Sequence, residues 1–594
     1  MQLAVSTSPN HTMLRRRKNV WYSVKDGNWS DPNTWMSNAL DRRNVTMPQA
    51  GDDVVINHNV IVDMWITVNN LYIAGSLLDS SITNINITVN GDLQATGIVN
   101  FAANNSNISL VLNGYNNFIN SFSSGTSSTI IYGGYYDQRV LNLSYRNLTT
   151  QGFGNKYLTA NTTISGNLSV FNLECLGYDL TVNGTTTVSN TNQGKFGKSG
   201  SGNLLFIGQF TSVTSTIDWS GGNPNVEFRG GIAYDSYKFN TGTGTFKFTT
   251  NNQTFFGNNN ISGTWNAPIL ISGAITLTNI GGSNLNSFST INGDNASSTL
   301  NNDGKITLNN TTVPMATGIF NYMHGSTSAM AYNMTGNYTL PYTSYINLMT
   351  GLPGTKSSGG TTTITGNLTV NSNFDCGIYD LIVNGTTNIS NGADGSAFKK
   401  TRAGNLLFIG QFGLGGTQGI DWSGGNPNVE FRGGFALDCY FFNTGTGTLK
   451  FTTNNQNISL KDNNTGSFVA PILISGAITV TNISSGKGFS TTGVINGDNT
   501  NSVWNNNGYL NYQSATAPMA TGKLYCNQAA NTFIYGLAGN QDIQVPSDPT
   551  PGYKNLTLNG SGAKRLLGNV SVKGTYTLTP PATLDSNGFA LTNP

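Results

Sequence analysis

The sequence predicts an all-β chain whose strands stack into a parallel β-helix, also called a β-solenoid. Short segments such as 245–250 and 275–278 alternate apolar and polar residues, a pattern typical of strands with one buried face. Turns rich in Asn and Gly separate these segments, and both residues tolerate the positive φ angles of tight corners. The third observation is a long internal repeat. Chained β-sandwiches are the alternative fold.

The chain contains two copies of a unit of about 200 residues. Segments 202–210 and 404–412 both read GNLLFIGQF, and segments 217–231 and 420–434 both read IDWSGGNPNVEFRGG. A partial third copy begins at Tyr553, because YKNL there matches YRNL at Tyr145 and YINL at Tyr345. We therefore expect five parts: an N-terminal arm (1–20), a cap with the first coils (21–144), the first solenoid repeat (145–344), the second repeat (345–552) and the partial third (553–594).

Frequent turns and scarce charge favour a solenoid over sandwiches. A unit of this length would hold roughly eight to ten coils, and the whole chain about 24. Asn side chains at matching positions of successive coils would stack in ladders. An uncapped first coil would expose unpaired backbone groups and an apolar core. We expect Trp21, Trp29 and Trp35 to cap it.

The composition argues against several classes of function. The 29 Lys and Arg against 27 Asp and Glu give a net charge of +2, which offers no basic field for nucleic acid. No apolar run reaches the ~18 residues of a membrane span. The 4 cysteines are scattered and the 3 histidines are far apart, so we predict no disulfide framework, metal centre or cofactor. Cys175 and Cys376 occupy matching repeat positions and are interpreted as buried apolar residues.

The only basic run lies near the N-terminus, at Arg15, Arg16, Arg17 and Lys18. No apolar core follows it, which is the wrong order for a secretory signal, although the composition is that of an extracellular surface protein. Two interpretations of the run stay open: an arm that docks on a partner protein, and a solvated tail.

Two segments near the start carry a family resemblance. GNWSDPNTW at 27–35 and PQAGDDVVI at 48–56 resemble the opening of parallel β-helix proteins on Bacteroidota cell surfaces, and are similar to the eight-glycine β-helix domain. The cycle YxNL, GNLxV, YDLxVNG resembles the repeats of the same surface adhesins. We expect neither the signal peptide nor the type IX sorting domain of that family. Adhesin repeats without export signals resemble a tail or head fibre of a phage that infects such bacteria.

The resemblance implies a non-enzymatic structural fibre of a virion. Such a protein is assembled in the host cytoplasm, is exposed on the particle surface and takes part in host attachment. Residues 1–60 would provide attachment, with the N-terminal arm on other virion proteins. A homo-oligomer such as a trimer, and a host-surface glycan or protein, would be the other partners. A polysaccharide-degrading tailspike and a bacterial surface adhesin are the two alternatives.

Asp218 with Glu227, and their copies Asp421 with Glu430, are the best carboxylate pairs for a glycoside hydrolase or lyase. Hydrolysis needs two carboxylates ~5–10 Å apart on a groove. The competing interpretation is structural, with Asp in turn hydrogen bonds and Glu paired with Arg on adjacent strands. Duplication favours the structural interpretation, because a corner is copied with its coil whereas an active site is rarely copied intact. We therefore predict no catalytic residue.

Five aspartates are candidate Ca²⁺ ligands, since Ca²⁺ binds carboxylate and carbonyl oxygens. They are Asp52, Asp53, Asp63, Asp294 and Asp498. No EF-hand or nonapeptide calcium repeat accompanies them, so turns stabilised by Asx hydrogen bonds are the favoured interpretation.

Overall fold

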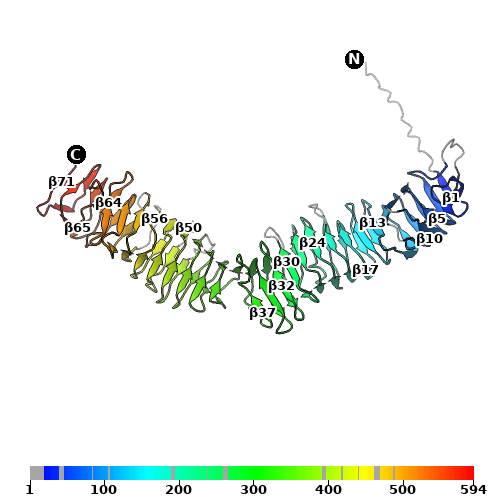
Figure 1. The fold of residues 1–594 in the computed structure, drawn as a ribbon, viewed down its shortest axis with the longest axis horizontal. Helices are drawn as coiled ribbons and strands as arrows, with labels where there is room; N and C mark the ends of the chain where they lie inside the picture. The colour runs from blue at the N-terminus through cyan, green and yellow to red at the C-terminus, as the bar shows by residue number, and fades with distance from the viewer. Residues whose placement is uncertain are drawn as a thin grey trace, which may run out of the picture. The chain divides into compact units, whose positions relative to one another are not determined.

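The computed structural model describes residues 19–38, 46–82, 84–104, 107–188, 194–236, 238–257, 265–390, 397–415, 419–438, 441–460, 468–485 and 489–593. Within these ranges the chain is all-β, and parallel strands stack into a β-solenoid of about 22 turns (Figure 1). One short 3₁₀ turn, η1 (Pro32–Thr34), is the helical element among the described residues. The predicted solenoid is confirmed, and the alternative of chained sandwiches is wrong. In the described ranges, no helix has the length and apolar character needed to cross a membrane.

Contacts divide the chain into two compact units. Unit 1 comprises residues 1–277 with 291–298, and unit 2 comprises residues 278–290 with 299–594. Each unit is a stack of turns whose strands form parallel sheets around an apolar core. In unit 1 the register joins Leu148 to Leu168, Leu168 to Thr186 and Thr186 to Phe210, so successive turns take 20, 18 and 24 residues.

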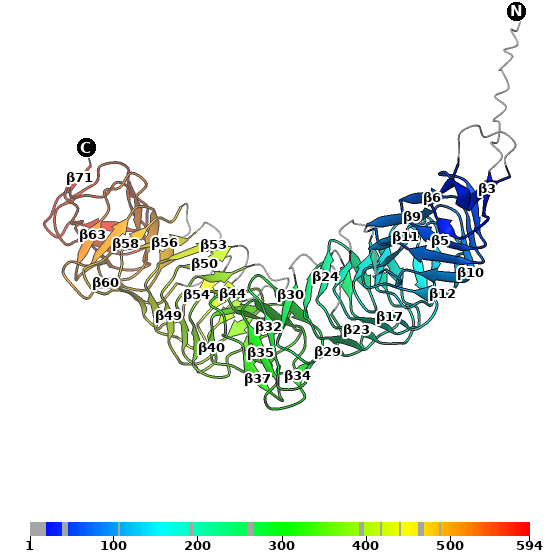
Figure 2. The same ribbon diagram turned by 45° about the vertical axis from the view of Figure 1, so that its right-hand side comes forward.

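Three sheets surround the core in most of unit 1, and Figure 2 shows β17, β23 and β29 of the third sheet following one another along the unit. The first sheet contains β6 (Ile66–Val68), β9 (Ile85–Val89), β11 (Ile108–Leu112), β13 (Thr129–Tyr132), β15 (Asn147–Thr150), β18 (Leu168–Val170), β21 (Thr186–Val188), β24 (Phe210–Val213), β27 (Ile232–Asp235) and β30 (Gln253–Gly257). The second contains β14 (Gln138–Val140), β16 (Lys156–Leu158), β19 (Asn172–Glu174), β22 (Lys195–Gly197), β25 (Thr216–Asp218) and β28 (Lys238–Asn240). The third contains β17 (Thr162–Ile164), β20 (Leu180–Val182), β23 (Leu204–Phe206), β26 (Val226–Phe228), β29 (Phe246–Phe248), β31 (Ile269–Ile271) and β34 (Ile291–Gly293).

Unit 2 repeats this plan. Its first sheet contains β33 (Asn284–Ser287), β36 (Lys305–Leu308), β38 (Ala329–Tyr332), β41 (Asn347–Thr350), β44 (Leu368–Val370), β47 (Thr387–Ile389), β50 (Phe412–Gly415), β53 (Phe435–Asp438), β56 (Gln456–Leu460), β58 (Thr479–Asn482), β61 (Val503–Asn506) and β63 (Lys523–Tyr525). The second contains β39 (Tyr338–Thr339), β42 (Lys356–Ser357), β45 (Phe374–Asp375), β48 (Ala397–Lys399), β51 (Gly419–Asp421) and β54 (Phe441–Asn443). The third contains β40 (Ser344–Tyr345), β43 (Thr362–Ile364), β46 (Leu381–Val383), β49 (Leu406–Phe408), β52 (Val429–Phe431), β55 (Leu449–Phe451), β57 (Ile472–Ile474) and β60 (Ile495–Gly497).

Because apolar and polar residues alternate, the side chain of every second strand residue is buried. In the third sheet of unit 1, Phe206, Phe228 and Phe248 are fully buried and stack on one another, with ring centroids 5.6 and 5.4 Å apart. Large rings in parallel-displaced contact contribute packing beyond the area that they bury. In these three turns the core therefore contains a column of aromatic rings that runs from turn to turn.

Asn side chains link successive turns, as the sequence predicts. In unit 2, the side-chain amide of Asn309 donates to Asn286 at 2.6 Å, and that of Asn333 donates to Asn309 at 2.9 Å. Each amide both donates to one neighbour and accepts from the other, so that the ladder can extend as long as Asn recurs at the same position. Such ladders hold the turns in register.

The N-terminal strands of unit 1 bury all three tryptophans that the sequence analysis assigned to a cap. β1 (Val20–Ser23) pairs antiparallel with β3 (Trp35–Ser37) and parallel with β4 (Asp53–Ile56). Trp29 and Trp35 pack edge to face with centroids 4.8 Å apart, and Trp35 Nε1 donates to the Trp29 carbonyl at 2.8 Å. Trp21 Nε1 donates to Asp52 at 2.9 Å. The capping role itself stays an interpretation.

Candidate functional site

Asp218 and Glu227 lie on different sheets of unit 1. Asp218 ends β25 in the second sheet, Glu227 is the middle residue of β26 in the third, and a corner separates the two strands. Asp218 accepts hydrogen bonds from the hydroxyl of Ser220 at 2.6 Å and from its backbone N–H at 3.3 Å. Burial works to raise the pKa of Asp218, but these hydrogen bonds and nearby lysines outweigh it and hold the pKa below its usual value.

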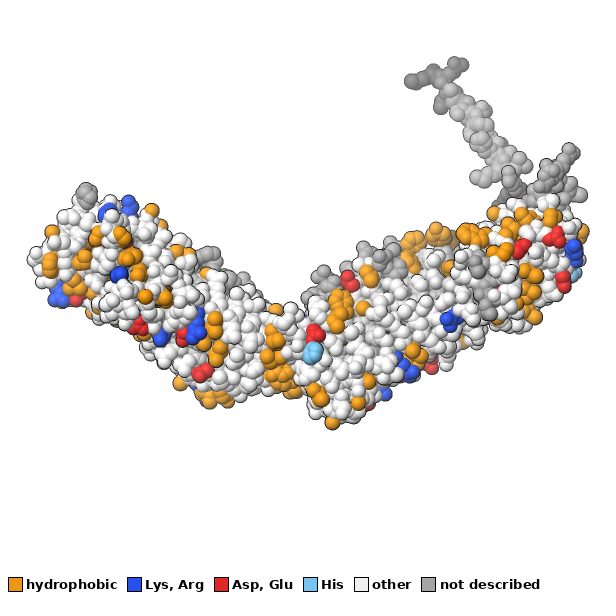
Figure 3. Space-filling model, in the orientation of Figure 1, with side chains coloured by type: hydrophobic (Ala, Val, Ile, Leu, Met, Phe, Trp, Pro, Cys, Tyr) orange, Lys and Arg blue, Asp and Glu red, His pale blue; other side chains and the backbone are white. Residues whose placement is uncertain are grey.

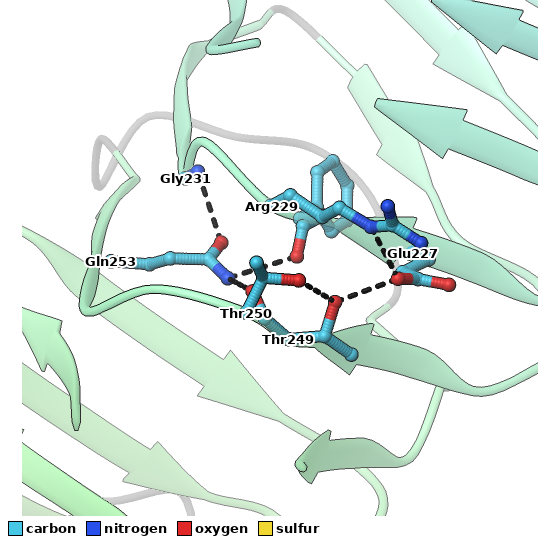
Figure 4. Close-up of polar contacts among 7 residues, drawn as sticks. Glu227, Arg229, Gly231, Thr249, Thr250 and Gln253 are labelled. Carbon is cyan, nitrogen blue, oxygen red and sulfur yellow. Dashed lines mark hydrogen bonds and ion pairs between the residues drawn. The ribbon is translucent and has the colours of Figure 1, made fainter. Parts of the chain in front are cut away.

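Glu227 is held by two neighbours on the outer face of the solenoid (Figure 4). Its Oε1 accepts from Arg229 Nε at 2.7 Å and from the hydroxyl of Thr249 at 2.6 Å. Burial works to raise the pKa of Glu227, but the hydrogen bonds from Thr249 and Arg229, together with the charges of Arg229 and Lys247, lower it overall. A general acid needs the opposite shift. Glu227 is therefore built as a stable carboxylate.

Gln253 is hydrogen-bonded to the backbone around this cluster (Figure 4). Its side-chain oxygen accepts from Gly231 N–H at 3.0 Å, and its amide donates to the carbonyls of Phe228 and Thr249 at 2.9 and 2.7 Å. Thr250, which follows Thr249 in the same loop, has a φ of 79°, in the left-handed region that β-branched residues avoid. The loop that presents Thr249 to Glu227 is thus tied down by Gln253 and locally strained at Thr250.

The second repeat reproduces the cluster. Glu430 accepts from Arg432 and Thr452 at 2.7 Å each, and Gln456 makes the three hydrogen bonds of Gln253 at 2.8, 2.9 and 2.7 Å. Thr453 has a φ of 75°. Asp421 accepts from Ser423 as Asp218 does from Ser220. The carboxylates are thus copied together with the groups that neutralise them.

An open groove lies on the outer face of the third sheet in each repeat. The groove in unit 1 has a volume of about 520 Å³, and Asp179, Leu205, Glu227 and Lys247 line it. The groove in unit 2 has a volume of about 570 Å³ and is lined by the copies Asp380, Leu407, Glu430 and Lys450. Sequence analysis missed Asp179, although it lies in the YDLxVNG segment used to align the repeats. Its carboxylate accepts from the N–H of Asn203 at 2.6 Å.

The five aspartates considered for Ca²⁺ accept hydrogen bonds from the protein itself. The groups that donate to them belong to Trp21 and Gln49 for Asp52, Asn69 and Asn70 for Asp53, Ser30 for Asp63, Ser272 and Gly273 for Asp294, and Ser475 and Gly476 for Asp498. Most of these bonds join neighbouring turns and are not local Asx turns. Among the described residues, no group of three or more His, Cys, Asp or Glu is placed to hold a metal ion.

Comparison with known proteins finds no match. No family model, no curated protein and no solved structure is similar to this chain at a significant level. Function is therefore inferred from the residues alone.

Two further sequence expectations concern other residues. Arg15, Arg16, Arg17 and Lys18 lie outside the described residues. Cys175 and Cys376 are fully buried with free thiols, and burial raises the pKa of both. The interpretation of these two cysteines as buried residues is confirmed.

The sequence analysis also missed a stripe of exposed aromatic side chains in unit 1. Tyr115, Tyr135, Tyr136 and Phe153 expose 61%, 74%, 82% and 62% of their surface. Figure 3 shows hydrophobic side chains gathered over the part of unit 1 that contains β13. An aromatic residue beside a turn has the same sequence signature whether its ring enters the core or leaves it, so only the structure separates these rings from the buried ones.

Proposed function

We propose that the chain is a non-enzymatic structural fibre of a phage virion, in a tail or head position, that takes part in host-surface attachment. The N-terminal arm, residues 1–20, would dock on other virion proteins, and copies of the chain would assemble into a homo-oligomer such as a trimer. The solenoid would be exposed on the particle surface and would meet a host glycan or protein.

One observation carries the non-enzymatic part of this proposal. Glu227 and Glu430 are bound by Arg and Thr with distances that agree between the repeats within 0.1 Å. A catalytic groove has no need for the same carboxylate held by the same two neighbours twice, whereas a duplicated solenoid turn keeps the bridges that join it to the next turn. The carboxylates are best explained as parts of the shaft.

Mass spectrometry of purified particles tests the virion assignment. Peptides from this chain should occur in particles purified on a density gradient, and their amount relative to known tail or head proteins should stay constant across the particle fractions. Their absence from particles would overturn the proposal. Recovery from the envelope of the producing cell, without particles, would support the bacterial adhesin.

A polysaccharide-degrading tailspike is the second candidate, because Asp179 and Glu227 line one groove. It predicts release of reducing ends from a host capsular polysaccharide. The double variant Glu227→Gln, Glu430→Gln would abolish that release, and Asp218→Asn, outside both grooves, is the matched control. Activity that survives in the double variant would exclude the grooves as the catalytic centres.

A further inference from the structure

The exposed aromatic stripe lies at one corner of successive turns in unit 1. The register aligns Leu112 of β11 with Tyr132 of β13, and Tyr132 with Thr150 of β15. Tyr115, Tyr135 and Phe153 each follow their strand by three residues, so they occupy the same corner on three consecutive turns. We call this set, with Tyr136, the aromatic corner.

Two rings of the aromatic corner, Tyr135 and Phe153, are in contact with each other. Tyr135 and Phe153 are stacked with centroids 6.1 Å apart and an interplanar angle of 27°, and Phe153 meets Phe171 of the next turn edge to face at 6.1 Å. Contiguous exposed apolar surface of this kind marks an interaction site in soluble proteins. The stripe follows the stacking direction, so an extended ligand would lie across several turns.

Buried polar side chains fix the backbone under the rings. The fully buried Lys156 donates from Nζ to the carbonyls of Gly134 and Tyr136 at 2.7 and 3.2 Å, and to that of Gly154 at 2.9 Å. Gln138 joins the turn before, donating to the Gly114 carbonyl at 2.6 Å. A rigid backbone lowers the entropy that a ligand must remove on binding. The aromatic corner is thus preorganised.

The scaffold of this corner is copied in the other repeats, but its rings are not. Lys356 donates to the carbonyls of Gly336 and Gly354, and Lys564 donates to those of Leu537 and Gly539, as Lys156 does in unit 1. At the position of Tyr135 the two later copies of this corner have Thr335 and Ala538, and at the position of Phe153 they have Pro353 and Ser561. The fold therefore does not need the aromatic rings, which points to a role in binding.

Charge and polar groups narrow the choice of ligand. Residues 107–172 contain four charged side chains, Asp137, Arg139, Arg146 and the buried Lys156. Nucleic acid would need a basic track beside the rings. The charged group that directly follows Tyr136 is a carboxylate: Asp137 accepts from the N–H of Asn155 at 2.9 Å and from the hydroxyl of Tyr157 at 3.2 Å.

We propose that the aromatic corner binds a neutral polysaccharide chain. The C–H faces of the sugar rings would pack on the exposed surface of Tyr135 and Phe153, and the sugar hydroxyls would bond to polar groups beside them such as Asp137. This inference rests on the proposed function, because it assigns the glycan contact of host attachment to one place on the shaft.

The test uses the full chain on an array of immobilised neutral polysaccharides: dextran, mannan, xylan, and neutral bacterial capsular and O-antigen glycans. We expect binding to at least one of them. The variant Tyr135→Thr, Phe153→Ser takes residues that occur at the same positions of other copies, and it should weaken that binding about tenfold or more while circular dichroism stays unchanged. Phe288→Ser, at a ring that is 43% exposed elsewhere, is the matched control and should bind as the native chain does.

Three results would overturn the inference. They are no binding to any neutral polysaccharide, equal binding by the double variant, and a change of oligomeric state in the double variant by light scattering, which would make the corner a self-association surface. This glycan-binding test is independent of the mass spectrometry of particles. If the native chain binds a glycan, the double variant loses that binding and the chain is absent from purified particles, the virion assignment would be rejected and the glycan site would stand.

Discussion

The hydroxyl groups of Tyr132 and Tyr145 share a buried hydrogen bond of 2.9 Å. Tyr145 donates its proton to the carbonyl of Leu141 at 2.6 Å, and the N–H of Leu141 donates to the Tyr132 oxygen at 2.9 Å. Tyr132 must therefore donate to Tyr145, and the three bonds close a ring. The same ring recurs where the second repeat meets the partial third copy, formed by Tyr535, Tyr553 and Gln544 at 2.7, 2.6 and 3.1 Å.

Tyr145→Phe should lower the free energy of unfolding by about 1–3 kcal/mol, because the Leu141 carbonyl and the Tyr132 hydroxyl lose a buried partner. Urea unfolding followed by fluorescence measures the change. Tyr345→Phe is the matched control in the second repeat, where the hydroxyls are 3.3 Å apart, and should cost less. Equal losses in the two variants would contradict the role of the closed ring.

Alkaline pH should unfold the protein through its buried tyrosines. Burial raises the pKa of Tyr132 to about 12, and that of Tyr512 to about 12 as well. The unfolded chain releases these protons near pH ~10, so the stability that they contribute is present below that pH and is lost as the pH rises toward 12. Phenolate absorbance and circular dichroism, followed together against pH, should change together. Ionisation of all tyrosines near pH ~10 without loss of structure would contradict this prediction.

Glu227→Gln should cost about 1 kcal/mol or less at neutral pH, because the ion pair with Arg229 is partly exposed. The pKa of Glu227 is lowered in the folded state, so the native carboxylate stabilises the fold above its unfolded pKa of ~4.3 and loses this contribution as the pH falls below it. Thermal unfolding of the native chain and the variant should therefore converge in acid. Glu430→Gln should behave alike, and a variant more stable than the native chain at neutral pH would refute the bridging role.

Thr250→Gly should raise the free energy of unfolding by about 0.5–1 kcal/mol, since glycine adopts a φ of 79° without the steric clash that a Cβ atom causes there. Differential scanning calorimetry measures the shift. Thr187→Gly, at an exposed residue inside β21, is the control and should destabilise, because glycine weakens a strand interior. A lower melting temperature for Thr250→Gly would show that its hydroxyl contact with Thr249 outweighs the strain.

The solenoid could be predicted because its signals are periodic. Phe206 and Phe228 face the core as the alternation of their segments requires, and they are aligned on successive turns. The site could not be predicted in the same way. Asp218 and Glu227 are nine residues apart, but the corner between them turns the chain from one sheet to the next, and sequence spacing does not reveal where a corner falls. Glu227 instead shares a groove with Asp179, which belongs to an earlier turn.

Strands that pair in the solenoid lie close together in the sequence. Tyr132 of β13 is aligned with Thr150 of β15, and Leu168 with Thr186, separations of 18 residues each. A chain emerging from the ribosome therefore delivers each new turn onto one that has already been completed, and a nascent solenoid can lengthen from its N-terminal end without waiting for distant segments. Truncation from the C-terminal side should consequently shorten the folded stack by whole turns, while loss of the first turns would remove the template on which the others form.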